Sequence, residues 1–222
     1  MAEREARLAR VVEHAPDTRS LFLRLPPGER MEFRPGQFVS CLLPVGEKPP
    51  AIRPYSVASS PEDEELELCL NLVPGGLGSQ YLLGLTPGAV VRLTGPWGTF
   101  VLDRAPDAEA VFIADGTGIA PIRPMIHRAL ATAVRPVTLL YGRPDGAPLL
   151  FADELAVPRP NYTPVVMPSP SLLDETKHRY VTADADRERH FYICGVGPIV
   201  YALRDLLRGS GYARQAVRYE KW

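Results

Sequence analysis

The sequence predicts two domains, an antiparallel β-barrel followed by an α/β domain with a mainly parallel sheet. The chain has 222 residues, which is enough for two compact domains of roughly 100 residues each. Its first half shows short apolar runs between turn signals, and its second half alternates apolar runs with helical stretches. The two patterns meet in a polar, proline-containing segment at 102–108, so we expect domains over residues 1–102 and 103–222.

Six short strands are expected in the first half. Alternation of apolar with other residues is clearest at 66–73, and turns such as Pro26-Pro27-Gly28 separate the runs. Antiparallel strands of this length are typical of a small barrel. The expected strands are 6–13, 20–25, 37–43, 55–58, 66–73 and 90–93, with one brief helix at 78–83.

The second half predicts βαβ units, because apolar strands alternate there with helical stretches. We expect strands at 110–114, 137–141, 163–167 and 191–194, and helices at 119–133, 149–155 and 198–208.

The charge balance argues against a nucleic-acid or anionic-membrane partner, because 25 basic residues face 26 acidic ones. No apolar run reaches the roughly 18 residues of a membrane span, and the charged N-terminus does not resemble a secretory signal. The cysteines Cys41, Cys69 and Cys194 form no C-x-x-C pair, so we expect no metal site. A reducing cytoplasm is the expected location.

The most informative motif is Arg53-Pro54-Tyr55-Ser56. An arginine makes paired hydrogen bonds to phosphate, a tyrosine offers a flat apolar face, and a serine hydroxyl bonds a ring nitrogen. On a strand, Arg53 and Tyr55 share one face, so phosphate and ring contacts could be made together. These groups suit a flavin nucleotide. The alternative is an edge strand with an exposed arginine and a half-buried tyrosine.

A glycine-rich stretch at 75–82 offers a second candidate site. Gly76 and Gly78 leave room for close backbone approach, and Ser79 lies at the expected helix start, where backbone N–H groups attract phosphate. A capped loop without a ligand is the alternative.

Two further glycine turns follow predicted parallel strands. Gly116-Thr117-Gly118 opens a helix, with Pro121 in its first turn, and suits a pyrophosphate, although its spacing is not G-x-G-x-x-G. Cys194 would lie at the carboxyl end of the last strand, the edge where such sheets bind ligands. A small buried apolar residue is the alternative for Cys194.

In this order, the motifs resemble those of the ferredoxin–NADP reductase superfamily. The R-x-Y-S pattern matches at Arg53, Tyr55 and Ser56, G-T-G-I-A-P matches at 116–121, and C-G matches at 194–195. The resemblance covers nearly the whole chain. It implies an FAD-binding barrel, a Rossmann-like NAD(P)-binding domain, and hydride transfer from NAD(P)H to FAD.

The resemblance also implies residue roles. It implies catalytic roles for Ser56, Cys194 and Glu220. It implies cofactor-binding roles for Arg53, Pro54, Tyr55, Ser56, Gly76, Gly78, Ser79, Gly116, Thr117, Gly118, Pro121, Gly195 and Trp222.

The sequence departs from its relatives at Asp115, where many of them have a small neutral residue. A carboxylate close to a pyrophosphate would repel it, unless the carboxylate points away or binds a cation through water.

Relatives that prefer NADPH often place serine and arginine after the third strand of this domain. Residues 167–172 contain serines without a following arginine, which favours NADH.

The electron acceptor is expected to be a separate redox protein or a small molecule, because the sequence shows neither a cysteine-rich iron–sulfur segment nor a fused ferredoxin domain. Two alternatives remain. One is an electron-transfer subunit that acts only within a larger complex, and the other is a non-catalytic redox sensor.

Overall fold

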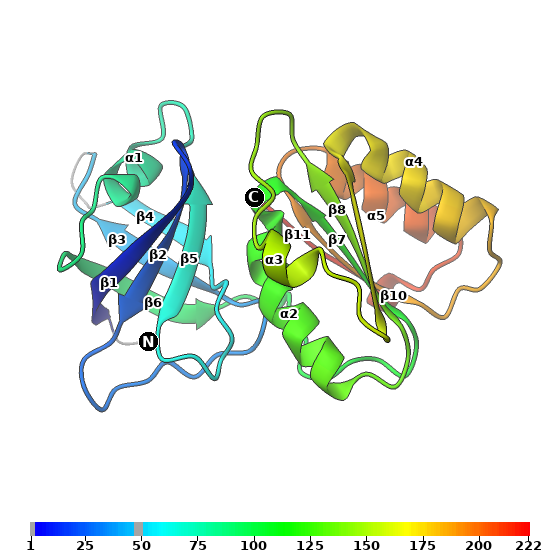
Figure 1. Cartoon of the computed structure of the whole chain (residues 1–222), viewed down its shortest axis with the longest axis horizontal. Helices are drawn as coiled ribbons and strands as arrows, with labels where there is room; N and C mark the ends of the chain where they lie inside the picture. Colours follow the sequence, from blue (N-terminus) through cyan, green and yellow to red (C-terminus); the bar gives the residue numbers. More distant parts are fainter. Residues whose placement is uncertain (1–2, 47–50) are drawn as a thin grey trace. The chain divides into compact units, whose positions relative to one another are not determined.

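The computed structural model describes residues 3–46 and 51–222, and the chain divides into two compact units at residues 1–101 and 102–222 (Figure 1). Each unit has its own sheet and its own buried core. The predicted fold class, an antiparallel domain followed by a parallel α/β domain, is confirmed.

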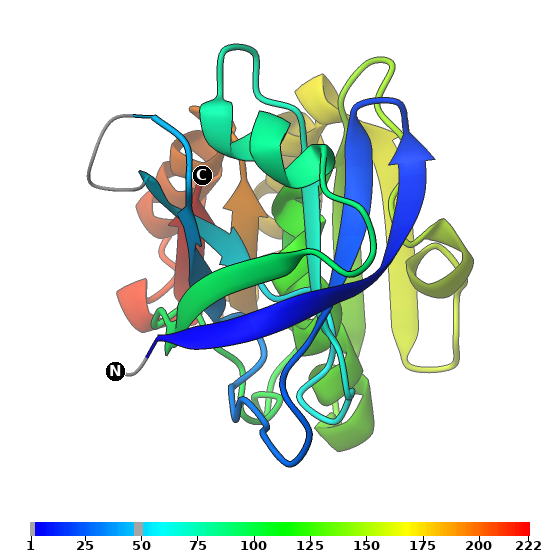
Figure 2. The ribbon, with the colours of Figure 1, turned by 90° about the vertical axis from the view of Figure 1, so that its left-hand side faces the viewer.

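Unit 1 is a six-stranded antiparallel sheet in the order β4-β3-β6-β1-β2-β5. The long first strand bends: its first residues pair with β6 and the rest pair with β2 (Figure 2). Just beyond β4, the Ala58 N–H donates to the Glu67 carbonyl of β5 at 2.8 Å, which draws the two ends of the sheet together. The elements are β1 (Arg4–Ala15), β2 (Thr18–Arg24), β3 (Phe38–Leu43), β4 (Ala51–Ser56), β5 (Leu66–Asn71), α1 (Leu77–Leu83) and β6 (Val90–Trp97).

The core of unit 1 follows from the two-residue period of its strands. In β3, Val39, Cys41 and Leu43 are fully buried, and the residues between them are half-buried. This alternation places one apolar face inside the barrel.

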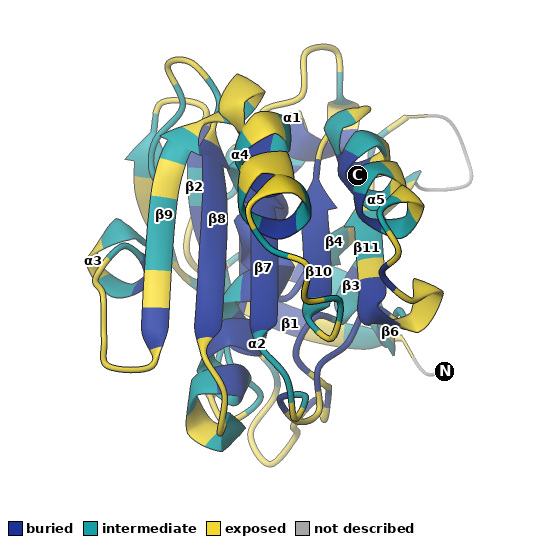
Figure 3. Ribbon diagram, turned by 90° about the vertical axis from the view of Figure 1, so that its right-hand side faces the viewer, coloured by how far each residue is buried: buried dark blue, intermediate teal, exposed yellow. Residues whose placement is uncertain are grey.

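Unit 2 is a five-stranded parallel sheet in the order β11-β10-β7-β8-β9. The chain runs outward from β7 to β8 and β9, then crosses to β10 on the other side of β7, so the strand order reverses between β7 and β10. Figure 3 shows β7, β8 and β10 buried along most of their length, whereas the edge strand β9 is mixed. The strands are β7 (Ala110–Asp115), β8 (Val137–Arg143), β9 (Tyr162–Pro168), β10 (His190–Gly195) and β11 (Val217–Lys221).

The helices of unit 2 cover both faces of its sheet. α4 and α5 pack on the face that carries Val111, Ile113 and Leu140, and α2 packs on the opposite face (Figure 1). The helices are α2 (Ile119–Thr132), α3 (Ala152–Leu155), α4 (Leu172–Lys177) and α5 (Ile199–Gly209).

The structure differs from the sequence predictions at several elements. β4 begins at Ala51 rather than at 55, and β6 continues through the glycine and proline to Trp97. α4 and β11 were not predicted. The predicted helix at 149–155 is confined to α3, because Phe151 adopts a left-handed φ of 57°, which an α-helix does not continue.

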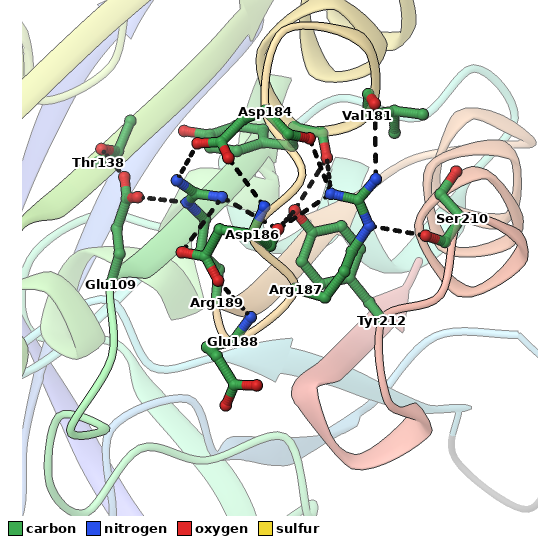
Figure 4. A network of polar contacts seen from close by, with 11 residues as sticks. Glu109, Thr138, Val181, Asp184, Asp186, Arg187, Glu188, Arg189, Ser210 and Tyr212 are labelled. Atoms are coloured by element: carbon green, nitrogen blue, oxygen red, sulfur yellow. Dashed lines mark hydrogen bonds and ion pairs between the residues drawn. The ribbon is translucent and has the colours of Figure 1, made fainter.

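Two arginines fix the loop before β10 to the rest of unit 2 (Figure 4). The Arg187 Nε donates to the Ser210 carbonyl at 2.7 Å, and a terminal nitrogen donates to the Asp184 carbonyl at 2.8 Å. Arg189 pairs with the Glu109 carboxylate at 2.6 Å and with the Asp184 carboxylate at 2.5 Å. This network sets where β10 enters the sheet, and so it indirectly positions the residues at the other end of β10.

Replacing Arg187 with alanine is expected to lower the free energy of unfolding by about 2 kcal/mol, because a charged donor to several carbonyls is lost. Chemical denaturation measures this change. Arg104→Ala is the control: that side chain is 74% exposed and 4.0 Å from Asp107, so its loss should change stability by less than about 0.5 kcal/mol. Equal effects of the two substitutions would contradict an anchoring role for Arg187.

Candidate functional site

In unit 1, the structure brings Arg53, Tyr55 and Gly78 together. A Cβ added to Gly78, in α1, would lie 3.0 Å from the Arg53 Cγ and 3.4 Å from the Tyr55 hydroxyl. Arg53 and Tyr55 therefore share the face of β4 that meets α1, and a side chain at 78 would crowd both. Burial raises the pKa of the Tyr55 phenol to about 12, so this hydroxyl stays protonated at neutral pH.

The Arg53 guanidinium donates to the neighbouring Ile52 carbonyl at 2.9 Å and is exposed, which leaves it accessible to an anion. Pro54 lies on the edge strand β4, where a missing N–H disturbs no inner ladder. The Ser56 hydroxyl is buried and has no hydrogen-bond partner in the described part of the chain. Buried polar groups are normally paired, so an orphaned hydroxyl on this strand fits a bound polar ligand such as a flavin.

The glycine-rich loop before α1 uses its serine internally. The Ser79 hydroxyl accepts from the Val73 N–H at 3.0 Å and donates to the Gly76 carbonyl at 3.0 Å. A Cβ on Gly76 would lie 2.9 Å from the Val73 Cβ, so the loop closes tightly there. Ser79 therefore shapes this loop with its side chain.

In unit 2, two glycine turns touch at the point where the strand order reverses. A Cβ on Gly118 would lie 2.3 Å from the Cys194 carbonyl oxygen and 2.7 Å from the Gly195 Cα. Gly116 has a positive φ of 54°, and the buried Tyr141 hydroxyl donates to its carbonyl at 3.2 Å. The crevice outside the carboxyl ends of such strands is where open α/β sheets bind ligands.

The Gly116–Gly118 turn leads directly into α2, which is 14 residues long. Thr117 lies between the glycines, and Pro121 is buried in the first helical turn. Free N–H groups and the helix dipole at this end favour an anion such as a pyrophosphate.

β11 brings the last residues of the sequence to the end of β10. Cys194 pairs with Glu220 in the parallel ladder, and the Trp222 N–H donates to the Gly195 carbonyl at 3.1 Å. One carboxylate oxygen of Glu220 is buried without a partner among the described residues, and burial raises the pKa of this carboxyl to about 7. Burial, reinforced by Glu220, raises the pKa of the Cys194 thiol, so Cys194 is a neutral lining group and not a thiolate.

Asp115 lies on the face of the sheet covered by α4 and α5. Its carboxylate accepts a hydrogen bond from the Ser169 hydroxyl. Burial raises the pKa of Asp115, and the Ser169 hydrogen bond opposes that rise. Because α2 covers the other face, this carboxylate points away from the turn that suits a pyrophosphate.

Sequence reasoning missed Tyr141, and it considered Ser169 only as one of the serines after the third strand, not as a partner of Asp115. Tyr141 is an apolar-strand residue in the sequence, and only the fold shows that its hydroxyl fixes the Gly116 carbonyl. Gly142 was a usable signal that the Asp115 side chain lies over this strand, because a glycine at a strand end often marks close approach of another group.

Within residues 3–46 and 51–222, no three His, Cys, Asp or Glu side chains gather as metal ligands would. None of the helices in those ranges is both long enough and apolar enough to cross a membrane.

Two family models match the chain. The oxidoreductase FAD-binding domain matches residues 5–102, and the oxidoreductase NAD-binding domain matches residues 112–205. Ferredoxin–NADP reductase B of Sorangium cellulosum is 32% identical over 239 residues, covering 98% of this chain and 97% of that protein. The chain belongs to the ferredoxin–NADP reductase superfamily. It is an NAD(P)H-dependent flavoprotein oxidoreductase.

Other members of the superfamily match over nearly the whole chain. The ferredoxin reductase component of 3-ketosteroid-9-alpha-monooxygenase from Mycobacterium tuberculosis is 31% identical over 97% of this chain and 64% of that protein. A cytochrome P450 reductase from Amycolatopsis has a TM-score of 0.83 at 29% identity, covering 99% of this chain and 69% of that one. The ferredoxin NADP+ reductase of Neisseria gonorrhoeae, solved with FAD and NADP, has a TM-score of 0.82 at 23% identity, covering 100% and 99%, and shares the fold.

Proposed function

We propose that this reductase oxidises NAD(P)H, with a preference for NADH, and passes the electrons through FAD to a separate redox protein or a small acceptor. The relatives named as ferredoxin reductases and oxygenase reductase components support this proposal. The observation that carries it is the buried, unpartnered Ser56 hydroxyl on the strand that also presents Arg53 and Tyr55. The three buried cysteines form no disulfide, which fits a cytoplasmic location.

Unit 1 would hold the FAD through β4 and α1. The exposed Arg53 guanidinium would bind the pyrophosphate, and Tyr55 would stack on the isoalloxazine ring. Ser56 would donate its otherwise unpaired hydroxyl to the ring, and the missing side chain at Gly78 would leave room for the phosphates.

Unit 2 would hold the dinucleotide through the Gly116–Gly118 turn and α2. Bound FAD would supply the chemistry, because it accepts a hydride and releases electrons singly or in pairs. The protein mainly holds the reactants in position. Cys194 and Gly195 would border the nicotinamide, and Trp222 would contribute to cofactor binding. Glu220, with its raised pKa, would hold a proton near neutral pH.

Glu220→Gln is expected to remove a pH dependence. If protonated Glu220 assists, the rate of flavin reduction by NADH in the wild type falls about tenfold between about pH 6 and about pH 8, because a pKa of about 7 lies in that window. The glutamine variant should stay flat across it. Stopped-flow absorbance measures both profiles, and identical profiles would exclude a role for Glu220.

The raised pKa of Glu220 also predicts that stability changes with pH. The folded pKa of about 7 exceeds the ordinary value of 4.5, so the contribution of this carboxyl to the free energy of unfolding is complete below about pH 4.5. It is lost as the pH rises through about 7. Denaturation curves of Glu220→Gln should lack this decline. A decline of equal size in the variant would assign it to another group.

The decisive experiment is anaerobic reduction followed by visible spectroscopy. A yellow protein bleached by NADH faster than by NADPH supports the proposal. A yellow protein that neither nucleotide bleaches favours the non-catalytic sensor. A colourless protein that FAD does not reconstitute contradicts flavin binding.

A second candidate is a subunit active only within a complex, since several relatives are named as components. Ferricyanide and candidate ferredoxins separate the two functions. Fast turnover with an isolated acceptor supports the free-standing enzyme, and reduction without turnover supports the subunit.

A further inference from the structure

Asp115 ends β7 directly before the Gly116–Gly118 turn, and its side chain reaches across the sheet. Its carboxylate accepts a hydrogen bond from Ser169, the first residue after β9. β8 lies between β7 and β9. The bond therefore passes over the end of β8.

This crossing is possible because glycines end the neighbouring strands on that face. A Cβ on Gly142, in β8, would lie 3.1 Å from the Asp115 Oδ1 and 2.3 Å from the Leu172 Cδ1. A Cβ on Gly195, in β10, would lie 2.8 Å from the Asp115 Cβ. The Asp115 carboxylate therefore stands close to where a side chain from the end of β8 would begin.

In the classic dinucleotide-binding α/β fold the adenosine ribose is recognised at the end of the second strand, here β8, whereas NADPH-preferring relatives of this chain use residues after the third strand, here β9. An acidic side chain about 20 residues after the glycine turn accepts a hydrogen bond from the ribose 2′-hydroxyl, and an arginine nearby accommodates a 2′-phosphate. In this chain the corresponding stretch ends at Gly142 and Arg143. Gly142 has no side chain to offer, and Arg143 alternates to the opposite face of the sheet.

The charge of Asp115 is not cancelled by a neighbour. No Lys or Arg in the described ranges forms an ion pair with it, and Ser169 is its hydrogen-bonding side chain. Asp115 is half-buried, so a ligand at the carboxyl edge of the sheet can reach it.

We propose that Asp115 is a specificity-determining residue, whose carboxylate accepts a hydrogen bond from the 2′-hydroxyl of NADH and repels the 2′-phosphate of NADPH. Asp115 thus supplies from the first strand the acid that the classic dinucleotide-binding fold carries on the second. Ser169 is a positioning residue that holds this carboxylate over Gly142. The inference rests on the proposed use of NADH and identifies the side chain responsible for the preference.

The test compares binding of NAD+ and NADP+ to the FAD-loaded protein by calorimetry, with AMP and 2′-phospho-AMP as smaller probes. These readouts do not depend on hydride transfer. Asp115→Asn keeps the shape and removes the charge, and should raise NADP+ affinity relative to NAD+ at least about tenfold. Ser169→Ala keeps the charge and removes its anchor, so it should shift the ratio in the same direction by a smaller factor of about threefold.

Asp174→Asn, an exposed carboxylate on α4, is the matched control and should leave the ratio unchanged. An unchanged ratio in Asp115→Asn, or an equal loss of both affinities, would overturn the proposal. Wild-type protein that binds both dinucleotides equally would contradict the NADH preference, and a shift in the Asp115→Asn ratio would then still support the role of Asp115. Binding of neither dinucleotide would contradict both. If Asp115→Asn does not fold, the Ser169→Ala ratio decides.

Discussion

Substituting Gly118 with alanine is expected to slow flavin reduction by NADH at least about 100-fold while the protein stays yellow. The new Cβ would lie 2.3 Å from the Cys194 carbonyl oxygen, and 2.5 Å from its carbon, which are backbone atoms inside a parallel ladder. The turn must therefore move, and a displacement of about 1 Å can reduce a rate by about 100-fold. FAD binding should survive, because the substitution lies in the unit that matches the NAD-binding domain.

Gly209→Ala is the matched control for this substitution. A Cβ there meets no atom within 4 Å, and the residue ends α5. The control should keep the wild-type rate and should not lose stability. Stopped-flow reduction, together with the flavin spectrum, measures both variants. A Gly118→Ala protein that is reduced at the wild-type rate would show that contact between the two glycine turns is not needed.

Substituting Arg53 with alanine is expected to weaken FAD binding at least about 100-fold, so that the protein purifies largely colourless. Each charge-assisted hydrogen bond from a guanidinium to a phosphate contributes about 1.5–3 kcal/mol, and a paired contact contributes two of them. Fluorescence titration of the apoprotein with FAD measures the loss. Arg53→Lys should recover part of the affinity, because lysine keeps the charge without the paired geometry.

Arg24→Ala is the control for Arg53. Arg24 is also an exposed arginine of unit 1, but it pairs with Glu65 at 2.7 Å. Its loss should leave the FAD affinity unchanged. Equal weakening by both substitutions would assign the effect to the general charge of the unit and not to a phosphate contact at Arg53.

The fold class and the grouping of the main motifs could be predicted, because they depend on local pattern. Alternation along the strands predicted most of unit 1, and the strand–glycine–helix order predicted the ligand edge of unit 2. The close approach of Gly118 to Cys194 could be predicted from the rule that parallel strands end at one edge of the sheet.

The rest of the fold and of the site could not be predicted, because it depends on contacts between residues far apart in the sequence. α4 is six residues long, too short for helical periodicity to distinguish it from a loop. β11 does alternate, with Val217 buried and Arg218 exposed, but its pairing with β10 depends on tertiary context. The hydrogen bond between Asp115 and Ser169 could not be predicted, because it joins β7 to the end of β9 and depends on the missing side chain at Gly142.

The single-sided pairing of β11 has one more consequence. As an edge strand with one neighbour, β11 should fray more readily than the inner strands, and its amide protons should exchange early. Fraying would admit water to the Glu220 carboxyl, and the pKa of this carboxyl would then fall back toward that of an ordinary glutamate. The midpoint of the pH–rate curve would therefore report how often β11 separates from β10.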